Sequence, residues 1–197
     1  MTRTVCGFGK LSLGVFTFLL SAAGCMQSDK KDVQAAAAAA AASSGAAGAK
    51  PKVAKAAIEG RSGSKLTGEA VFSEVDGKVQ VIVTVAGAPP GKHAVHVHET
   101  GDCSAPDAKS AGSHFNPDGH AHGAPDSAAH HAGDFGNMDV GPDGAGKLEI
   151  ATKDLTVGPG SRSVAGRAII VHEKPDDFSQ PVGNAGGRIG CGVINAQ

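Results

Sequence analysis

The chain has 197 residues, with nine His, 29 Gly, no Trp, no Tyr and a formal net charge of −1. The charge is divided unevenly, because residues 1–56 carry 7 Lys and Arg against 2 Asp and Glu, whereas residues 57–197 carry 11 against 17. An acidic globular part argues against nucleic acid as a partner. The length allows one domain with additional segments, whose core must be built mainly from aliphatic side chains.

The first 24 residues have the features of an export signal. Basic residues precede an apolar run, residues 11–23, that is too short to span a bilayer comfortably. The small residues before Cys25 resemble a bacterial lipoprotein signal, in which cleavage leaves Cys25 as the lipidated first residue. Ordinary secretion is the alternative. We expect a signal peptide over residues 1–24, export to the periplasm or cell envelope, and anchoring to the outer membrane through a lipid on Cys25.

Residues 25–56 form a low-complexity segment with an unbroken Ala run at 35–42, followed by Ser, Gly, Ala and Lys. This composition cannot build a core, and an isolated helix of that length is marginal in water. We therefore expect a flexible tether over residues 25–56 and a globular domain over residues 57–197.

Alternating apolar and polar residues after residue 57 predict β-strands. Segments 65–75 and 78–86 flank Asp76-Gly77, a dipeptide typical of the type I′ turn of a hairpin. Further strands are expected around His96 and at residues 147–152, 164–172 and 188–194, whereas residues 99–145 are expected to be mostly loop. Many short strands without a convincing amphipathic helix favour a β-sandwich or barrel.

The segment His96-Val97-His98 is the first candidate for chemistry. Side chains two residues apart on a strand point to the same side, so the two imidazoles leave one face together while Val95 and Val97 face the core. Two imidazoles on a rigid strand make a good half-site for a transition metal. A pair of exposed strand histidines is the alternative.

The long loop adds a second set of metal-binding side chains. Three imidazoles and a carboxylate suit a tetrahedral zinc site, which would also order a loop without a core of its own. These side chains are His114, His122, His131 and Asp134. His172 joins His96 and His98 in a separate nitrogen-rich cluster that suits copper. The alternative is a His-rich loop that binds metals loosely or is only solvated.

Five segments together resemble the copper/zinc superoxide dismutase family: HAVHVHETGDC, AGSHFNP, HAGDFGN, IIVHEKPDD and GNAGGRIGCGVI. The resemblance covers essentially residues 57–197. It implies an all-β, Greek-key barrel or sandwich of about eight antiparallel strands with long metal-binding and channel loops. It also implies one copper and one zinc ion per subunit, and dismutation of superoxide to oxygen and hydrogen peroxide as the copper is alternately reduced and oxidised.

The resemblance assigns roles to particular residues. The implied copper ligands are His96, His98, His114 and His172, and the implied zinc ligands are His114, His122, His131 and Asp134. His114 would bridge the two metals and take up a proton during the cycle. The resemblance further implies Asp176 as a carboxylate that joins ligands of both metals, Arg188 as the residue that docks superoxide, and a disulfide between Cys103 and Cys191. His93, His120 and His130 receive no role and are expected at the surface.

Some alternatives remain at this point. A non-catalytic periplasmic copper- and zinc-binding protein could use the same scaffold. A zinc hydrolase is disfavoured, because Asp134 would fill the position that a reactive water needs. The resemblance allows a homodimer without specifying a surface. Residues 178–187 are uncharged, so substrate steering is left to other groups, with Lys109, Arg162 and Lys174 as candidates.

Overall fold

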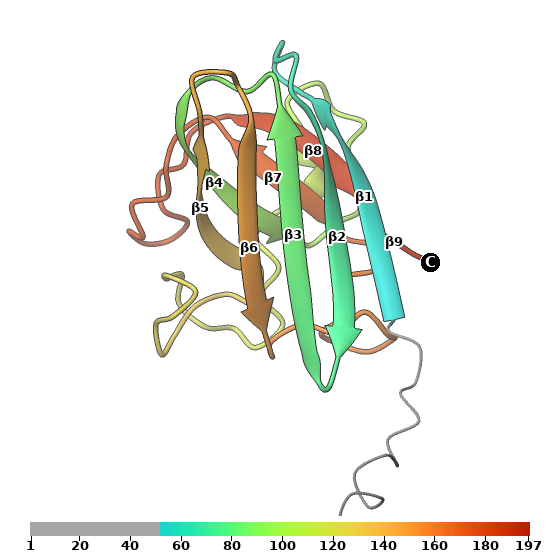
Figure 1. Cartoon of the computed structure of the whole chain (residues 1–197). Helices are drawn as coiled ribbons and strands as arrows, with labels where there is room; N and C mark the ends of the chain where they lie inside the picture. Colours follow the sequence, from blue (N-terminus) through green and yellow to red (C-terminus); the bar gives the residue numbers. More distant parts are fainter. Residues whose placement is uncertain (1–51) are drawn as a thin grey trace, which may run out of the picture. The chain divides into compact units, whose positions relative to one another are not determined.

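Nine β-strands form a closed antiparallel sheet in the part of the chain that the computed structural model describes, residues 52–197 (Figure 1). They are β1 (Lys52–Gly60), β2 (Thr67–Val75), β3 (Lys78–Ala86), β4 (Gly91–His98), β5 (Asp134–Val140), β6 (Gly146–Thr152), β7 (Ala168–His172), β8 (Arg188–Val193) and β9 (Asn195–Ala196). A short 3₁₀ helix, η1, covers Lys109–Ala111.

The order of the strands is β2-β3-β6-β5-β4-β7-β8-β1-β9, and pairing of β1 with β2 closes the barrel. The consecutive strands β3 and β4 are separated in the sheet by β6 and β5, and β6 and β7 are separated by β5 and β4. These crossovers are those of a Greek key. The predicted all-β Greek-key barrel is therefore confirmed, with a ninth strand of two residues beside β1.

The β2–β3 hairpin follows directly from its sequence. Asp76 and Gly77 have φ of 51° and 71°, as a type I′ turn requires at both central residues, and Val75 pairs with Lys78. Along β3 every second side chain is buried, beginning with Val79 and ending with Val85. These valines line the barrel interior with Phe72 and Phe135, whose ring centroids lie 6.4 Å apart.

Strand β4 divides apolar from polar side chains as predicted. Val95 and Val97 belong to the apolar core of the barrel, whereas His96 and His98 belong to the clusters of buried imidazoles described below. All four side chains are buried, because loops cover the outer side of this strand. The strand therefore separates an apolar interior from a polar site whose side chains are almost as deeply buried.

Two β-bulges lie next to these histidines. On β5 the register shifts so that Ala94 faces Asn137 but His96 faces Asp134, and Gly136, in the extra segment, has φ of 76°. On β8 the register shifts so that Val171 faces Gly190 but His172 faces Arg188. Bulges redirect side chains and occur often beside active sites. Each bulge here brings a charged residue opposite a strand histidine.

Three strands differ from the sequence expectation. β1 begins at Lys52, inside the range predicted as tether. The sequence did not reveal this start, because the buried side chains Ala54 and Ala56 hardly distinguish the strand from the Ala-rich segment before it. β5 lies within the range predicted as loop. The strand was missed because its bulge and polar residues hide the alternation of apolar and polar side chains. The strand predicted at 164–172 is shorter, with β7 beginning at Ala168.

The targeting predictions fall mainly outside the described residues. The predicted signal peptide over 1–24, the lipidated Cys25 and the tether up to residue 51 all lie there. Within residues 52–197, no helix has the length and apolar character needed to cross a membrane.

Candidate metal centre

Four buried histidines from distant parts of the chain form the first candidate metal group. His96 and His98 lie on β4, His172 ends β7 and His114 lies in the long loop. One ring nitrogen of each lies within 4.8 Å of those of the others. The segment around His114 is held along β4, since Phe115 N–H donates to Val97 O at 2.8 Å and Glu99 N–H donates to Ser113 O at 2.9 Å.

The second group shares His114 with the first and adds His122, His131 and Asp134. Nδ1 of His114 lies 2.9 Å from Oδ1 of Asp134, and Nδ1 of His131 lies 3.3 Å from the same oxygen. Nδ1 of His122 lies 2.9 Å from Oδ2 of Asp134. The backbone N–H groups of His131 and Gly123 donate to this second oxygen at 2.8 and 3.2 Å, which fixes the carboxylate at the start of β5.

Several ring nitrogens in these groups are buried and make no hydrogen bond within residues 52–197. They are His96 Nδ1, His98 Nε2, both Nδ1 and Nε2 of His172, and His122 Nδ1, which faces Asp134 Oδ2 without donating to it. A buried nitrogen without a partner is costly unless it binds something else. Three imidazoles with a carboxylate suit zinc, and four imidazoles suit copper, so the residues present fit both ions.

Burial is the largest cause of the lowered pKa values of four of these side chains, His96, His98, His131 and His172. For His172 the pKa falls to about 3. Burial opposes ionisation of Asp134, but the hydrogen bond with His114 and the one from His131 N–H hold the pKa of this carboxyl below its ordinary value. The site therefore favours neutral imidazoles and an ionised carboxylate, the forms that bind metal ions.

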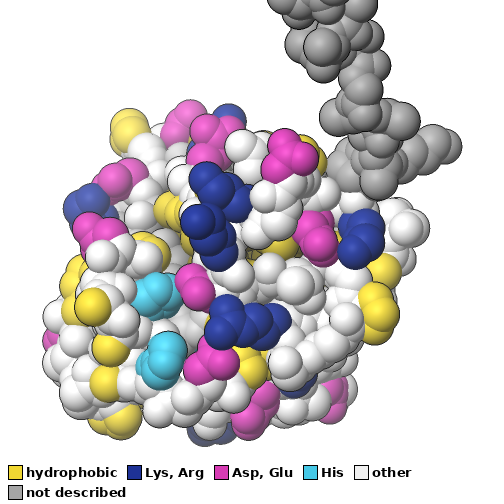
Figure 2. All heavy atoms as spheres, turned by 90° about the horizontal axis from the view of Figure 1, so that it is seen from below, with side chains coloured by type: hydrophobic (Ala, Val, Ile, Leu, Met, Phe, Trp, Pro, Cys, Tyr) yellow, Lys and Arg dark blue, Asp and Glu magenta, His cyan; other side chains and the backbone are white. Residues whose placement is uncertain are grey.

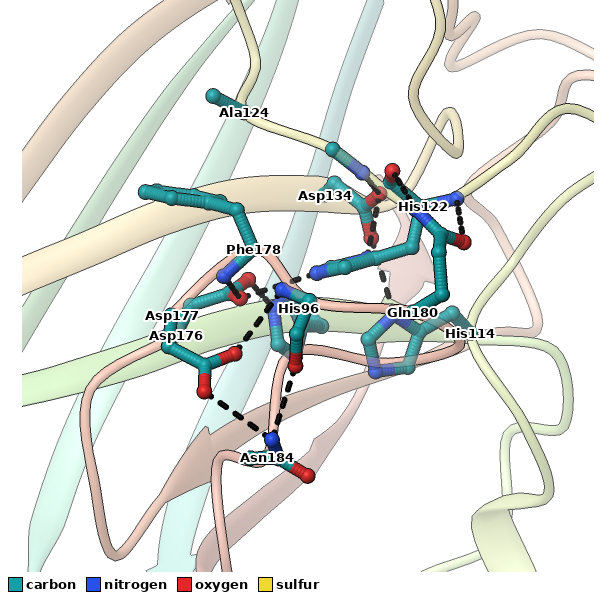
Figure 3. Close-up of polar contacts among 12 residues, drawn as sticks. His96, His114, His122, Ala124, Asp134, Asp176, Asp177, Phe178, Gln180 and Asn184 are labelled. Carbon is teal, nitrogen blue, oxygen red and sulfur yellow. Dashed lines mark hydrogen bonds and ion pairs between the residues drawn. The ribbon is translucent and has the colours of Figure 1, made fainter.

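Asp176 lies between the two groups (Figure 3). Its Oδ2 is 2.8 Å from Nε2 of His96, and its Oδ1 is 3.0 Å from Nε2 of His122. Nε2–H of each ring donates to the Asp176 carboxylate, which leaves the two Nδ1 atoms as free lone pairs. A Cβ on Gly183 would lie 1.8 Å from Oδ1 of Asp176, so this position has no space for a side chain.

Arg188 borders a cleft of about 420 Å³ that reaches the first group. His98, His114 and His172 line this cleft together with Val182 and Arg188. The guanidinium donates from Nη1 to Ala108 O and from Nη2 to Gly112 O, each at 2.7 Å. Two bonds to backbone carbonyls hold a positive fork at a fixed place beside the histidines.

Comparison with known proteins agrees with this geometry. The family described as copper/zinc superoxide dismutase (SODC) matches over residues 66–194. The chain belongs to the copper/zinc superoxide dismutase family. It is 45% identical over 131 residues to "Superoxide dismutase [Cu-Zn] 2" of Brassica juncea, covering 63% of this chain and 85% of that protein. A crystal structure of the clock protein EA4 superposes with a TM-score of 0.67 at 37% identity, covering 75% of this chain and 96% of that one.

Membership of the copper/zinc superoxide dismutase family gives the protein its activity and cofactors. The chain is a superoxide dismutase that uses copper and zinc, as the resemblance of its sequence segments implied. The predicted disulfide is also present: Cys103 and Cys191, 88 residues apart, are joined with their Cα atoms 5.8 Å apart. It attaches the loop that carries Ala108 and Gly112 to β8.

The expectation that His93 lies at the surface is wrong. Only 3% of His93 is exposed, with Nδ1 2.8 Å from His172 O and Nε2 2.8 Å from Pro89 O. The period of two could have shown this, because His93 shares a strand face with Val95 and Val97. His120 is exposed as expected, and His130 is partly buried with Nδ1 2.9 Å from His131 O.

Sequence reasoning also missed Asn137. Its side chain donates to Asp176 O at 2.9 Å and accepts from Asp176 N–H at 2.7 Å, so β5 fixes the backbone of this carboxylate. An Asn in a strand gives no such signal by itself. The partner lies 39 residues away, and only the folded chain shows the pairing.

The candidates for substrate steering differ in their surroundings. Arg162 pairs with Asp118 at 3.0 Å and with Asp154 at 3.5 Å. Figure 2 shows basic, acidic and His side chains mixed on the end of the barrel that is at the bottom of Figure 1. Lys109 pairs with Asp107 at 2.9 Å. Lys174 is exposed, and its aliphatic stem lies beside Gly186, which lines the cleft.

Proposed function

We propose that the four-histidine group binds copper and that the group containing Asp134 binds zinc, with His114 shared between them. The observation that carries this assignment is the membership of His114 in both groups. Its Nδ1 faces Asp134, which leaves Nε2 for the other group. Copper, when bound, supplies one-electron exchange: one superoxide loses an electron to give oxygen, and a second gains an electron and two protons to give hydrogen peroxide.

The protein's own groups bind the substrate and move its protons. Arg188 attracts the superoxide anion into the cleft and orients it beside His98 and His114. His114 carries a proton at Nε2 in one half of the cycle and gives it up in the other, while Asp134 keeps Nδ1 in place. Lys174 is the steering candidate whose position beside Gly186, a residue that lines the cleft, supports a part in substrate capture.

Metal content and activity test the assignment together. The purified protein should hold about one copper and one zinc ion per chain and accelerate superoxide decay. Removal of copper should abolish the acceleration, and added copper should restore it. Copper binding near stoichiometry without faster decay would instead support a non-catalytic metal-binding protein.

The shared histidine has its own test. With paramagnetic Co²⁺ in the zinc group and Cu²⁺ in the copper group, a shared imidazolate couples the two spins and removes the ordinary copper signal in electron paramagnetic resonance. An unchanged copper signal with both ions bound would contradict the sharing of His114.

Export and a lipid on Cys25 are also proposed, on the sequence pattern of residues 1–25 alone. The anchor and the catalyst are then separate, so Cys25→Ser should give a protein that leaves the membrane fraction and keeps full activity per copper. Membrane association that persists in Cys25→Ser would contradict the lipid anchor.

A further inference from the structure

The turn between β1 and β2, residues 61–64, contacts both parts of the structure that hold Arg188. Ser64 N–H donates to Arg61 O at 3.0 Å, and the two central residues, Ser62 and Gly63, have φ of 53° and 81°. These features define a type I′ turn. We refer to these four residues as the β1–β2 turn.

One set of contacts joins the β1–β2 turn to the strand that carries Arg188. The backbone N–H of Arg61 donates to Ile189 O at 2.9 Å, and Oγ of Ser62 donates to Arg188 O at 2.9 Å. Just before the turn, Gly60 pairs with Gly190. The bulged start of β8 is therefore held at three successive residues, from 188 to 190.

A second set joins the same turn to the disulfide loop. Nε of Arg61 donates to Cys103 O at 3.0 Å, and Ser62 N–H donates to Pro106 O at 2.8 Å. This loop also supplies Ala108 O and Gly112 O, the acceptors of the Arg188 guanidinium. The turn thus holds the backbone of Arg188 and the loop that receives its side chain.

The two turn residues have features that a simple connection does not require. Arg61 keeps only 18% of its side chain exposed and uses its guanidinium on backbone carbonyls of two segments, Cys103 O and Gly60 O. Ser62 has a positive φ, where glycine is more favourable. Its hydroxyl bond to Arg188 O is an interaction that glycine could not make.

We propose that Arg61 and Ser62 are positioning residues for the superoxide-binding guanidinium of Arg188. The disulfide fixes the loop at Cys103, whereas the carbonyls that hold Arg188 come later, at Ala108 and Gly112. The bond from Ser62 N–H to Pro106 O holds the intervening segment. Without the turn contacts, loop and strand can move relative to each other, and the guanidinium loses its fixed place above the cleft. This inference rests on the proposed role of Arg188.

The test uses fully metal-loaded, oxidised protein and measures superoxide decay per copper and the dissociation constant of azide, an anion that binds copper. Misplacement of a catalytic group can lower the reaction rate by up to about 100-fold. We therefore expect Arg61→Ala to slow superoxide decay by about 3–10-fold and to weaken azide binding by a similar factor. Arg61→Lys, which keeps the charge without the fork, should recover only part of the loss. Ser62→Gly removes the hydroxyl while relieving the positive φ, so it should slow decay by about 2-fold without loss of thermal stability.

Two controls separate positioning from other causes. Lys65→Ala removes a positive charge from an exposed residue next to the turn, and it should leave both readouts unchanged. In an Arg188→Ala background, Arg61→Ala should change superoxide decay and azide binding by less than about a further 1.5-fold, because its effect acts through Arg188.

Each failure has a distinct meaning. If Arg188→Ala alone leaves decay and azide binding unchanged, the proposed role of Arg188 is wrong. If Arg188→Ala is impaired but Arg61→Ala is not, the positioning role is wrong. An equal loss from Arg61→Ala with and without Arg188 also overturns it, since a general structural effect would then explain the data.

Discussion

Two parts of the barrel are built by different interactions. The hairpin wall, made of β2, β3 and β6, pairs without a register shift and turns alternate apolar side chains toward the core, fully buried on β3 and partly buried on β6. The metal face, made of β4, β7, the first residues of β5 and β8, and the loops 99–133 and 173–187, contains two bulges and nine buried polar side chains among the described residues. The wall is specified by local patterns, whereas the metal face needs partners that meet only after folding. The metal face therefore depends more strongly than the hairpin wall on bound metal ions.

Removal of both metals should affect the two parts most unequally. A ligand present at about 1,000 times its dissociation constant stabilises a protein by about 4 kcal/mol, so metal removal should lower Tm by roughly 10–15 °C and abolish activity. The buried imidazole nitrogens lose the partner that offsets their burial.

Hydrogen exchange can locate the stability that is lost on metal removal. Amides of the segment around His114 and of the loop 173–187 should lose protection on metal removal, while amides of β3 keep it until global unfolding. Equal loss of protection in the hairpin wall and the metal face would contradict their different dependence on metal.

Lower pH should destabilise the metal-free protein through the buried histidines of the metal face. Burial lowers the pKa of His172 from 6.5 to about 3 in the folded chain. Between these values the unfolded chain binds a proton that the folded chain does not, so the free energy of unfolding of the metal-free protein falls as pH drops below about 6.5. The lowered pKa values of His96 and His131 act in the same direction.

Urea unfolding of the metal-free protein across this range measures the slope. His172→Gln should have a smaller slope, because it removes one buried group with a lowered pKa. A free energy of unfolding that stays constant from neutral pH to about pH 4 would show that these imidazoles are not buried without metal.

The same contrast explains what the sequence could reveal. The Asp76-Gly77 turn and the alternation along β3 are local, and the structure has both as predicted. The grouping of His114 with β4 came from resemblance to a family, because no local pattern brings together residues so far apart in the chain. β5, its bulge and the pairing of Asn137 with Asp176 were missed for that reason. The buried His93 was missed although its strand face was readable.

Two glycines with nearly the same backbone test the contrast on a finer scale. Gly77 in the hairpin and Gly183 in the loop 173–187 have φ of 71° and 74°. A Cβ on Gly77 meets nothing within 4 Å, whereas one on Gly183 would lie 1.8 Å from Asp176 Oδ1 and 2.7 Å from His122 Nε2. Both Ala variants carry the same backbone cost of about 1 kcal/mol.

Only Gly183→Ala should change the metal centre. Displacement of a carboxylate that orients metal ligands typically costs 10–100-fold in metal affinity, so its zinc or copper dissociation constant should rise by about that factor. Gly77→Ala should bind both metals as the original protein does. Equal metal affinities in the two variants would show that Asp176 does not orient the ligands.

The smallest effect is expected from a charge on the metal-binding strand itself. Lys92 lies on β4 beside the buried His93, but its Nζ faces solvent and pairs with Asp139 Oδ1 at 2.8 Å, with 58% and 77% of the two side chains exposed. Exposed pairs contribute little, so Lys92→Ala should change the free energy of unfolding by less than about 0.5 kcal/mol and leave activity per copper unchanged. A larger effect in urea unfolding would mean that the outer side of β4 supports the metal face, and that the division between the two parts lies elsewhere than at this strand.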